Sequence, residues 1–207
     1  KVMALFVPVA IGLSGSRINI FVNTMIISFL PERSLTWLNY AFRIQHLPLG
    51  LFGIAVGTVA LPAFSRFAAE GNIEETKRML FDSLKMVLFL TIPTSALIAF
   101  LSNPITSVIY ERGRFSAADT PPVASILVLY MIGVPFISAL RNVAGVFYAS
   151  KDAKVPMAAS FASVGINIVL NLSLMRVLGY LAFPLSATIA AVVNILILVL
   201  CLPKKIG

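Results

Sequence analysis

The chain has 207 residues, of which 59% are hydrophobic and only 12% are charged, and its mean hydropathy is +0.97. A soluble domain carries about 25% charged residues, so this composition excludes an ordinary soluble protein and indicates a polytopic membrane protein. The net charge of +8 lies in short segments between apolar runs. That placement favours a role in membrane topology over binding to nucleic acid.

Six apolar stretches are each long enough to cross a bilayer as a helix, which takes ~20 residues. They cover approximately residues 3–30, 35–62, 80–101, 122–149, 155–178 and 182–202. Helices are expected because lipid offers the backbone no hydrogen-bond partners and strand-like alternation is absent from these stretches. We therefore predict an all-α fold with six transmembrane helices. Between the second and third stretches, residues 69–79 predict a short amphipathic helix at the membrane surface.

The charges between the spans predict an orientation. Eight basic residues fall on one side of the membrane: Lys1, Arg66, Lys77, Arg78, Lys151, Lys154, Lys204 and Lys205. Four fall on the other: Arg33, Arg112, Arg114 and Arg176. The positive-inside rule then places both ends of the chain in the cytoplasm. Apolar sequence starts directly after Lys1, so we expect the chain to be part of a longer protein.

The first span carries Arg17 near its middle, together with Asn19 and Asn23. A charged side chain at the bilayer centre costs roughly 2.5–3.5 kcal/mol on insertion scales, which favours a wet cavity or an anion as its partner. Asn19 and Asn23 are four residues apart, so they share one helix face.

In the second span, Arg43 and His46 also share a face. Arg43 either faces a polar cavity, where it would bind an anion, or snorkels to the head groups. His46 is either a satisfied polar residue or a proton relay. The charge of a guanidinium is permanent, so we favour the cavity and expect Arg43 to contribute to substrate binding.

The same span contains features that bend helices or bring them close together. Pro48 removes a backbone donor and Gly50 follows it, so we predict a hinge there. Gly53 and Gly57 form a G-x-x-x-G pattern, which permits close contact between helices.

Later spans carry further polar residues. Arg141 and Asn142 lie deep in the fourth span, Asn167 and Asn171 are four apart in the fifth, and Thr188 and Asn194 lie in the sixth. Hydrogen bonds between helices explain such asparagines without any ligand. A polar or cation site at Asn23, Asn167, Asn171 and Thr188 is the alternative, although neutral oxygens hold cations weakly.

The sequence lacks the groups of metal ligands and acid–base residues that are typical of enzyme active sites. One His and one Cys, Cys201, cannot supply a metal cluster, so we predict neither a metal nor a cofactor. All eight acids fall in loops or at span ends, where no carboxylate pair is placed for acid–base chemistry inside the bundle.

Several segments resemble the MurJ/MviN lipid II flippase family of the multidrug/oligosaccharidyl-lipid/polysaccharide exporter superfamily. The main one is YAFRIQHLPLGLFGIAVGTVALPAFSR (residues 40–66), and the others are NTMIISFLP (23–31), YERGRFSAADT (110–120) and FYASKDAKVPM (147–157). Their order and spacing match the second half of the family.

The resemblance implies one six-helix lobe of a two-lobed transporter, which moves lipid-linked peptidoglycan precursor across the bacterial inner membrane by alternating access. It also implies a missing N-terminal lobe, and cell-wall synthesis proteins as further partners. Cavity arginines of the family hold the pyrophosphate of the substrate. Arg43 matches the family's motif arginine, and Arg141 falls where members often have a basic residue. Arg17 falls where many members have Gln.

The chain also departs from the family pattern. Phe42 replaces an acid directly before the motif arginine, and His46 replaces an acid that some members carry. Asn23 and Asn171 stand where some relatives have acids that serve a cation site. These departures argue against ion coupling through acids at these positions.

Three rival functions remain from the sequence. A related exporter of drugs or polysaccharide-lipids is disfavoured by the cationic cavity and by the motifs. A non-transporting membrane scaffold would tolerate loss of the arginines. An integral-membrane enzyme is opposed by the absence of acids within the spans.

Overall fold

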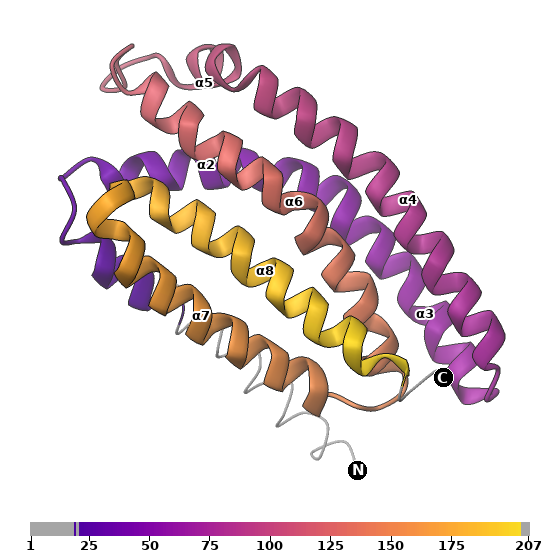
Figure 1. Cartoon of the computed structure of the whole chain (residues 1–207). Helices are drawn as coiled ribbons and strands as arrows, with labels where there is room; N and C mark the ends of the chain where they lie inside the picture. Colours follow the sequence, from indigo (N-terminus) through magenta and orange to yellow (C-terminus); the bar gives the residue numbers. More distant parts are fainter. Residues whose placement is uncertain (1–18, 20, 204–207) are drawn as a thin grey trace.

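The computed structural model describes residues 19 and 21–203. Long helices run back and forth beside one another (Figure 1). Residues 21–27 are helical, and the rest of the predicted span 3–30 lies mostly outside the described residues. The elements that follow are α2 (Ser34–Pro48), η1 (Leu49–Ile54), α3 (Ala55–Ala69), α4 (Ile73–Phe100), α5 (Ser102–Tyr110), α6 (Thr120–Ala149), α7 (Lys154–Leu178), η2 (Gly179–Leu181) and α8 (Ala182–Cys201).

The described helices match the second to sixth predicted spans. Four helical stretches are long and apolar enough to cross a membrane: Ser34–Ala69, Ile73–Phe100, Thr120–Ala149 and Lys154–Cys201. The last of these reverses direction at η2, where Gly179 adopts φ 56°, and so forms two antiparallel legs, α7 and α8 (Figure 1). The predicted all-α transmembrane fold is confirmed.

The prediction of a separate surface helix at residues 69–79 is wrong. The chain turns at Gly71, which has φ 67°, and α4 begins at Ile73 and continues without a break to Phe100. Asn72 caps this helix, because its side-chain oxygen accepts a hydrogen bond from the Glu75 backbone N–H at 3.1 Å. Capping at Asn72 starts the helix seven residues before the predicted span, and the amphipathic segment forms its first turns.

Helix α5 was not predicted. Its first turn contains Asn103 and Pro104, which are typical of loops. Proline is nevertheless tolerated in a first helical turn, where its missing N–H would have no partner.

Helix α6 is the central element, since it packs against α2, α3, α4, α5 and α8. Two apolar clusters lie along it. One surrounds Val123–Val134 near α5, and the other surrounds Val143–Phe147 near the opposite end of the bundle. We call these the α5 end and the opposite end of the bundle. Between the clusters, α6 carries Ser138, Arg141 and Asn142.

A π-helical segment interrupts the second span. η1 follows Pro48 directly and joins α2 to α3 within one continuous helical stretch. Proline cannot donate the usual backbone hydrogen bond, and π-helical turns are wider than α-helical ones. The regular helix is therefore interrupted at the position of the predicted hinge, Pro48 and Gly50, whose movement stays a prediction.

Candidate functional site

The first group of site residues lies on the exposed face of α2. Arg43 and His46 are both exposed, and the ring of His46 packs edge-on against Phe42, with centroids 4.3 Å apart. No ion pair involves Arg43 within the part of the chain that the structure describes. An uncompensated guanidinium on an apolar helix can form bidentate, charge-assisted hydrogen bonds to phosphate oxygens.

Arg141 belongs to a second location. It lines a cavity of about 360 Å³ at the junction of α3, α6, α7 and α8. Other lining residues include Gly57, Tyr148, Ser160 and Asn194. Tyr148 and Ser160 were missed by the sequence reasoning, because a tyrosine and a serine on apolar helices carry no distinctive spacing.

The two glycines of the G-x-x-x-G pattern explain how this junction forms. A Cβ placed on Gly53 would lie 2.6 Å from Ser138 Oγ, and one on Gly57 would lie 3.9 Å from the Cβ of Arg141. The predicted close helix contact is therefore confirmed. Gly57 follows Arg43 by fourteen residues, or about 21 Å along a helix at 1.5 Å per residue. The backbones of Arg43 and Arg141 thus lie at different heights along the bundle.

Around Arg141 the polar groups are only partly satisfied. The Nδ2 of Asn142 donates to the Ser138 carbonyl at 3.1 Å, and the Nδ2 of Asn194 donates to Ser163 Oγ at 3.3 Å. Within the described chain, Ser138 Oγ, Asn142 Oδ1 and Asn194 Oδ1 are buried without a partner. We call Ser138, Arg141, Asn142 and Asn194 the polar seam. Its unpaired oxygens are acceptors, and the Arg141 guanidinium is a donor.

Four asparagines form a hydrogen-bonded cluster between the first span and α7. Asn167 Oδ1 accepts from Asn19, Asn23 and Asn171 at 3.0, 3.1 and 3.2 Å. Asn171 also donates to Asn23 Oδ1 at 2.8 Å, while its own Oδ1 is buried without a partner among the described residues. The cluster joins two helices by amide hydrogen bonds and contains no carboxylate.

The remaining predicted site residues lie elsewhere. The hydroxyl of Thr188 donates to the Leu129 carbonyl of α6 at 3.2 Å, and this hydrogen bond does not join Thr188 to the asparagines. Arg17 lies outside the described residues.

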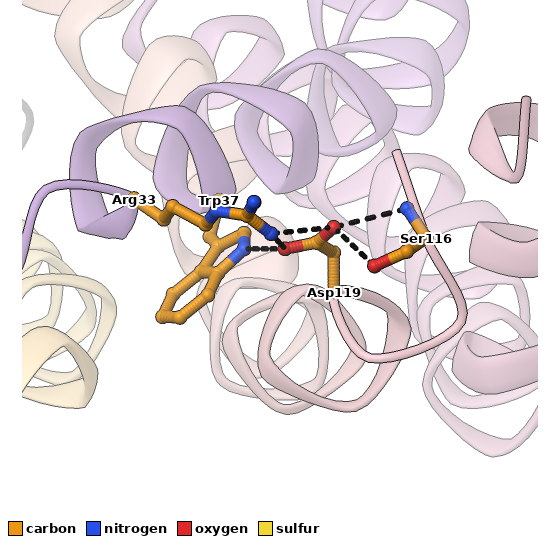
Figure 2. Close-up of polar contacts among 4 residues, drawn as sticks. All are labelled: Arg33, Trp37, Ser116 and Asp119. Atoms are coloured by element: carbon orange, nitrogen blue, oxygen red, sulfur yellow. Dashed lines mark hydrogen bonds and ion pairs between the residues drawn. The ribbon is translucent and has the colours of Figure 1, made fainter. Parts of the chain in front are cut away.

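A cluster centred on Asp119 was missed by the sequence reasoning (Figure 2). Its carboxylate accepts hydrogen bonds from Arg33 Nη1 at 2.9 Å and from Trp37 Nε1 at 3.0 Å. It also accepts from the backbone N–H and the hydroxyl of Ser116, at 3.0 and 2.9 Å. The Asp119 side chain is 6% exposed and that of Arg33 is 64% exposed.

We call Arg33, Trp37, Ser116 and Asp119 the Asp119 clamp. It fixes the loop between α5 and α6 to the start of α2. The hydrogen bonds from the Ser116 backbone N–H and from Trp37 hold the pKa of Asp119 well below its ordinary value. The position of Asp119 directly before Thr120-Pro121-Pro122 is a signal for a helix start, but its partners on α2 are distant in sequence.

The sequence and the fold of this chain are similar to those of known proteins. The profile of the family described as "Lipid II flippase MurJ" matches residues 1–207. The chain belongs to the MurJ family. Curated relatives include "Probable lipid II flippase MurJ" of Rhizobium meliloti (strain 1021), 36% identical over 198 residues, 96% of this chain and 37% of the relative. "Lipid II flippase MurJ" of Burkholderia cenocepacia is 31% identical over 99% of this chain and 40% of the relative.

Solved structures agree with this family assignment. "Lipid II flippase MurJ, inward closed conformation" matches with a TM-score of 0.86 and 32% identity, over 97% of this chain and 43% of that chain. A structure described as a multidrug resistance MATE family transporter of the MOP superfamily matches at 0.85 but is 18% identical, so it shows the shared fold alone. The chain spans less than half the length of these relatives, as expected for one lobe.

Proposed function

We propose that this chain forms the second lobe of a flippase that moves lipid II from the inner to the outer leaflet of the bacterial inner membrane. Membership of the MurJ family supports this and favours a transporter over an enzyme. The observation that carries the proposal is the guanidinium of Arg43, which lies on a helix long and apolar enough to span the membrane and forms no ion pair with another described residue. An anionic head group would compensate its charge.

Arg43 is the proposed main contact for the substrate pyrophosphate. Arg141 is a second contact at a different depth, and Arg17 and His46 complete the proposed set. Because Arg43 and Arg141 are separated by about 21 Å along the helix direction, they would contact the head group in turn rather than together.

Transport by alternating access requires one part of the protein to move against another. We assign the bend to Pro48 and Gly50, next to the π-helical segment η1. No atom of the described residues lies within 4 Å of a Cβ placed on Gly50, so no close side-chain contact restrains this position there.

The four asparagines are proposed as the polar junction between the first span and α7. The predicted polar site comprises Asn23, Asn167, Asn171 and Thr188. The asparagines belong to the cluster, whereas Thr188 donates to the Leu129 carbonyl of α6. Its oxygens are neutral, so a cation there would be held more weakly than by carboxylates. Energy coupling through this site would therefore be weak in this chain.

The proposed partners are lipid II, membrane lipid, the N-terminal lobe and cell-wall synthesis proteins. Both chain ends are proposed to be cytoplasmic, which makes the α5 end of the bundle the outer side.

Charge reversal tests the proposal in the full-length protein. Arg43→Glu should abolish growth of a strain depleted of its own lipid II flippase, because the carboxylate repels pyrophosphate. Arg176→Glu is the matched control, since Arg176 is also exposed but lies in the last turn of α7. Normal growth with Arg43→Glu, at equal expression, would defeat the proposed role and favour a scaffold.

A further inference from the structure

A cationic pocket, separate from the cavity that Arg141 lines, lies at the α5 end of the bundle. It has a volume of about 550 Å³. Its lining residues come from the start of α2 and from the loop before α6: Arg33, Thr36, Trp37, Tyr40, Arg114, Phe115 and Asp119. Two arginines and one aspartate give this pocket a net positive charge.

The charge is concentrated on Arg114. Arg33 donates to both oxygens of Asp119, at 2.9 and 3.2 Å, so its charge is partly compensated. Arg114 forms no ion pair with any residue that the structure describes, and it is exposed. The pocket therefore offers a free guanidinium beside a second one that is already oriented.

The loop that carries Arg114 is held in a defined position. Thr120 donates to the Glu111 carboxylate at 2.6 Å, and Asp119 binds Ser116 and the start of α2. The turn between these anchors passes through Gly113, which has φ 64°. A cation on a fixed loop binds an anion with less loss of conformational entropy than one on a mobile loop.

The pocket and Arg43 lie along the same side of α2. Arg33, Thr36, Tyr40 and Arg43 follow one another at steps of three and four residues, which places them on one helix face. That face extends for about 15 Å from Arg33 to Arg43, at 1.5 Å per residue.

Shared aromatic residues connect the two locations. The rings of Tyr40 and Phe115, which line the pocket, lie 5.3 Å apart, and the ring of Tyr110 lies 4.4 Å from that of Tyr40. Burial raises the pKa of the Tyr110 hydroxyl, and the charge of Arg43 acts in the opposite direction. Arg43 is thus close enough for its field to reach the aromatic residues beside the pocket.

We propose that this pocket is a second anion site, which receives the phosphorylated head group of the lipid-linked precursor after Arg43, on the outer side of the membrane. The assignment rests on the proposed function, since it needs a head group that travels along this face of α2. Phosphate fits the site because guanidinium groups bind its oxygens by charge-assisted hydrogen bonds. An anionic phospholipid of the outer leaflet carries the same chemistry, so the test separates the two sources.

The test measures binding of short-chain lipid II, and separately of phosphatidylglycerol, to the full-length protein in detergent. Arg114→Gln should raise the Kd for lipid II about tenfold, the scale of one lost charge-assisted hydrogen bond. Arg114→Lys should raise it less, since the charge remains. Arg112→Gln is the matched control, because Arg112 lies on the same loop and does not line the pocket. It should leave the Kd within twofold.

Each outcome decides one point. Equal Kd values for Arg114→Gln and Arg112→Gln, with weakened binding by Arg43→Gln, would overturn the outer pocket and leave the proposed function standing. Unchanged binding by Arg43→Gln would instead defeat the proposed function. If Arg114→Gln weakens the binding of phosphatidylglycerol as much as the binding of lipid II, the pocket is a phospholipid site and the assignment to the precursor fails.

Discussion

The α5 end and the polar seam of the bundle are built by different interactions. At the α5 end, the Asp119 carboxylate accepts hydrogen bonds from Arg33, from Trp37 of α2 and from the loop before α6. The rings of Tyr40 and Phe115 line the same pocket. At the seam, Gly53 and Gly57 bring η1 and α3 against α6, and amides and hydroxyls remain only partly paired. The first arrangement fixes geometry, whereas the second leaves buried polar atoms without a hydrogen-bond partner among the described residues. The hydrogen-bonded clamp and the partly paired seam thus lie at different positions along the bundle.

Removing the carboxylate of the clamp should have the largest effect. Asp119→Ala leaves Arg33, Trp37 and Ser116 without their shared acceptor, so we expect a loss of about 3 kcal/mol in the free energy of unfolding. The midpoint of thermal unfolding of the full-length protein in detergent measures this. Asp82→Ala is the control, since Asp82 is exposed and forms no ion pair with another described residue. Equal midpoints for the two variants would show that the clamp does not hold the loop.

Filling the close contact at the seam should have the next largest effect. Gly53→Ala places a methyl group 2.6 Å from Ser138 Oγ, so we expect a loss of about 1–2 kcal/mol from overpacking. Gly50→Ala is the matched control, because its Cβ would meet no atom of the described chain within 4 Å. The double variant Gly53→Ala/Ser138→Gly should recover part of the loss, and no recovery would contradict this explanation.

Much of this structure could be predicted from the sequence because its cause is local. Runs of about 20 apolar residues determine the spans, and the spacing of Gly53 and Gly57 predicted the close contact that the structure shows. The extension of α4 to Ile73 depended on one cap, Asn72, in a segment whose polarity also suits a surface helix. The Asp119 clamp could not be predicted, because Arg33 and Trp37 are more than eighty residues from Asp119.

The candidate site was only partly accessible for the same reason. Arg43 stood out through the cost of its charge in lipid, which needs no knowledge of neighbours. Other features depend on which helices pack together. These are the separation of Arg43 from Arg141, and the hydrogen bonds that join Asn19 and Asn23 to Asn167 and Asn171. A spacing of four residues shows a shared face but does not identify the partner helix.

Loss of the central amide in the asparagine cluster should have a smaller effect. Asn167→Ala removes the acceptor of three hydrogen bonds, and side-chain hydrogen bonds within membranes average about 0.6 kcal/mol each, so we expect a loss of about 1 kcal/mol. Asn103→Ala on the exposed surface of α5 is the control. Indistinguishable unfolding midpoints would indicate that the cluster does not join the first span to α7.

A change of pH should alter the stability of the protein least, because the effect is confined to acidic solution. The pKa of Asp119 is lowered in the folded protein, so its stabilising contribution is complete above the unfolded value of about 3.9 and is lost as the pH falls through the folded value. The difference in unfolding midpoint between the native protein and Asp119→Asn should stay constant from pH 7 to about 4.5 and shrink below pH 4. A difference that shrinks already between pH 7 and 6 would contradict the assignment to Asp119.

Transport in reconstituted vesicles tests the central claim most directly, that the Arg43 guanidinium binds a lipid-borne anion during translocation. The measurement is the rate at which the full-length protein moves labelled lipid II between leaflets, for the native chain, Arg43→Gln and Arg176→Gln. We predict that Arg43→Gln slows translocation at least tenfold, about 1.4 kcal/mol, while Arg176→Gln retains the native rate. A native rate for Arg43→Gln, at equal incorporation into the vesicles, would contradict the claim.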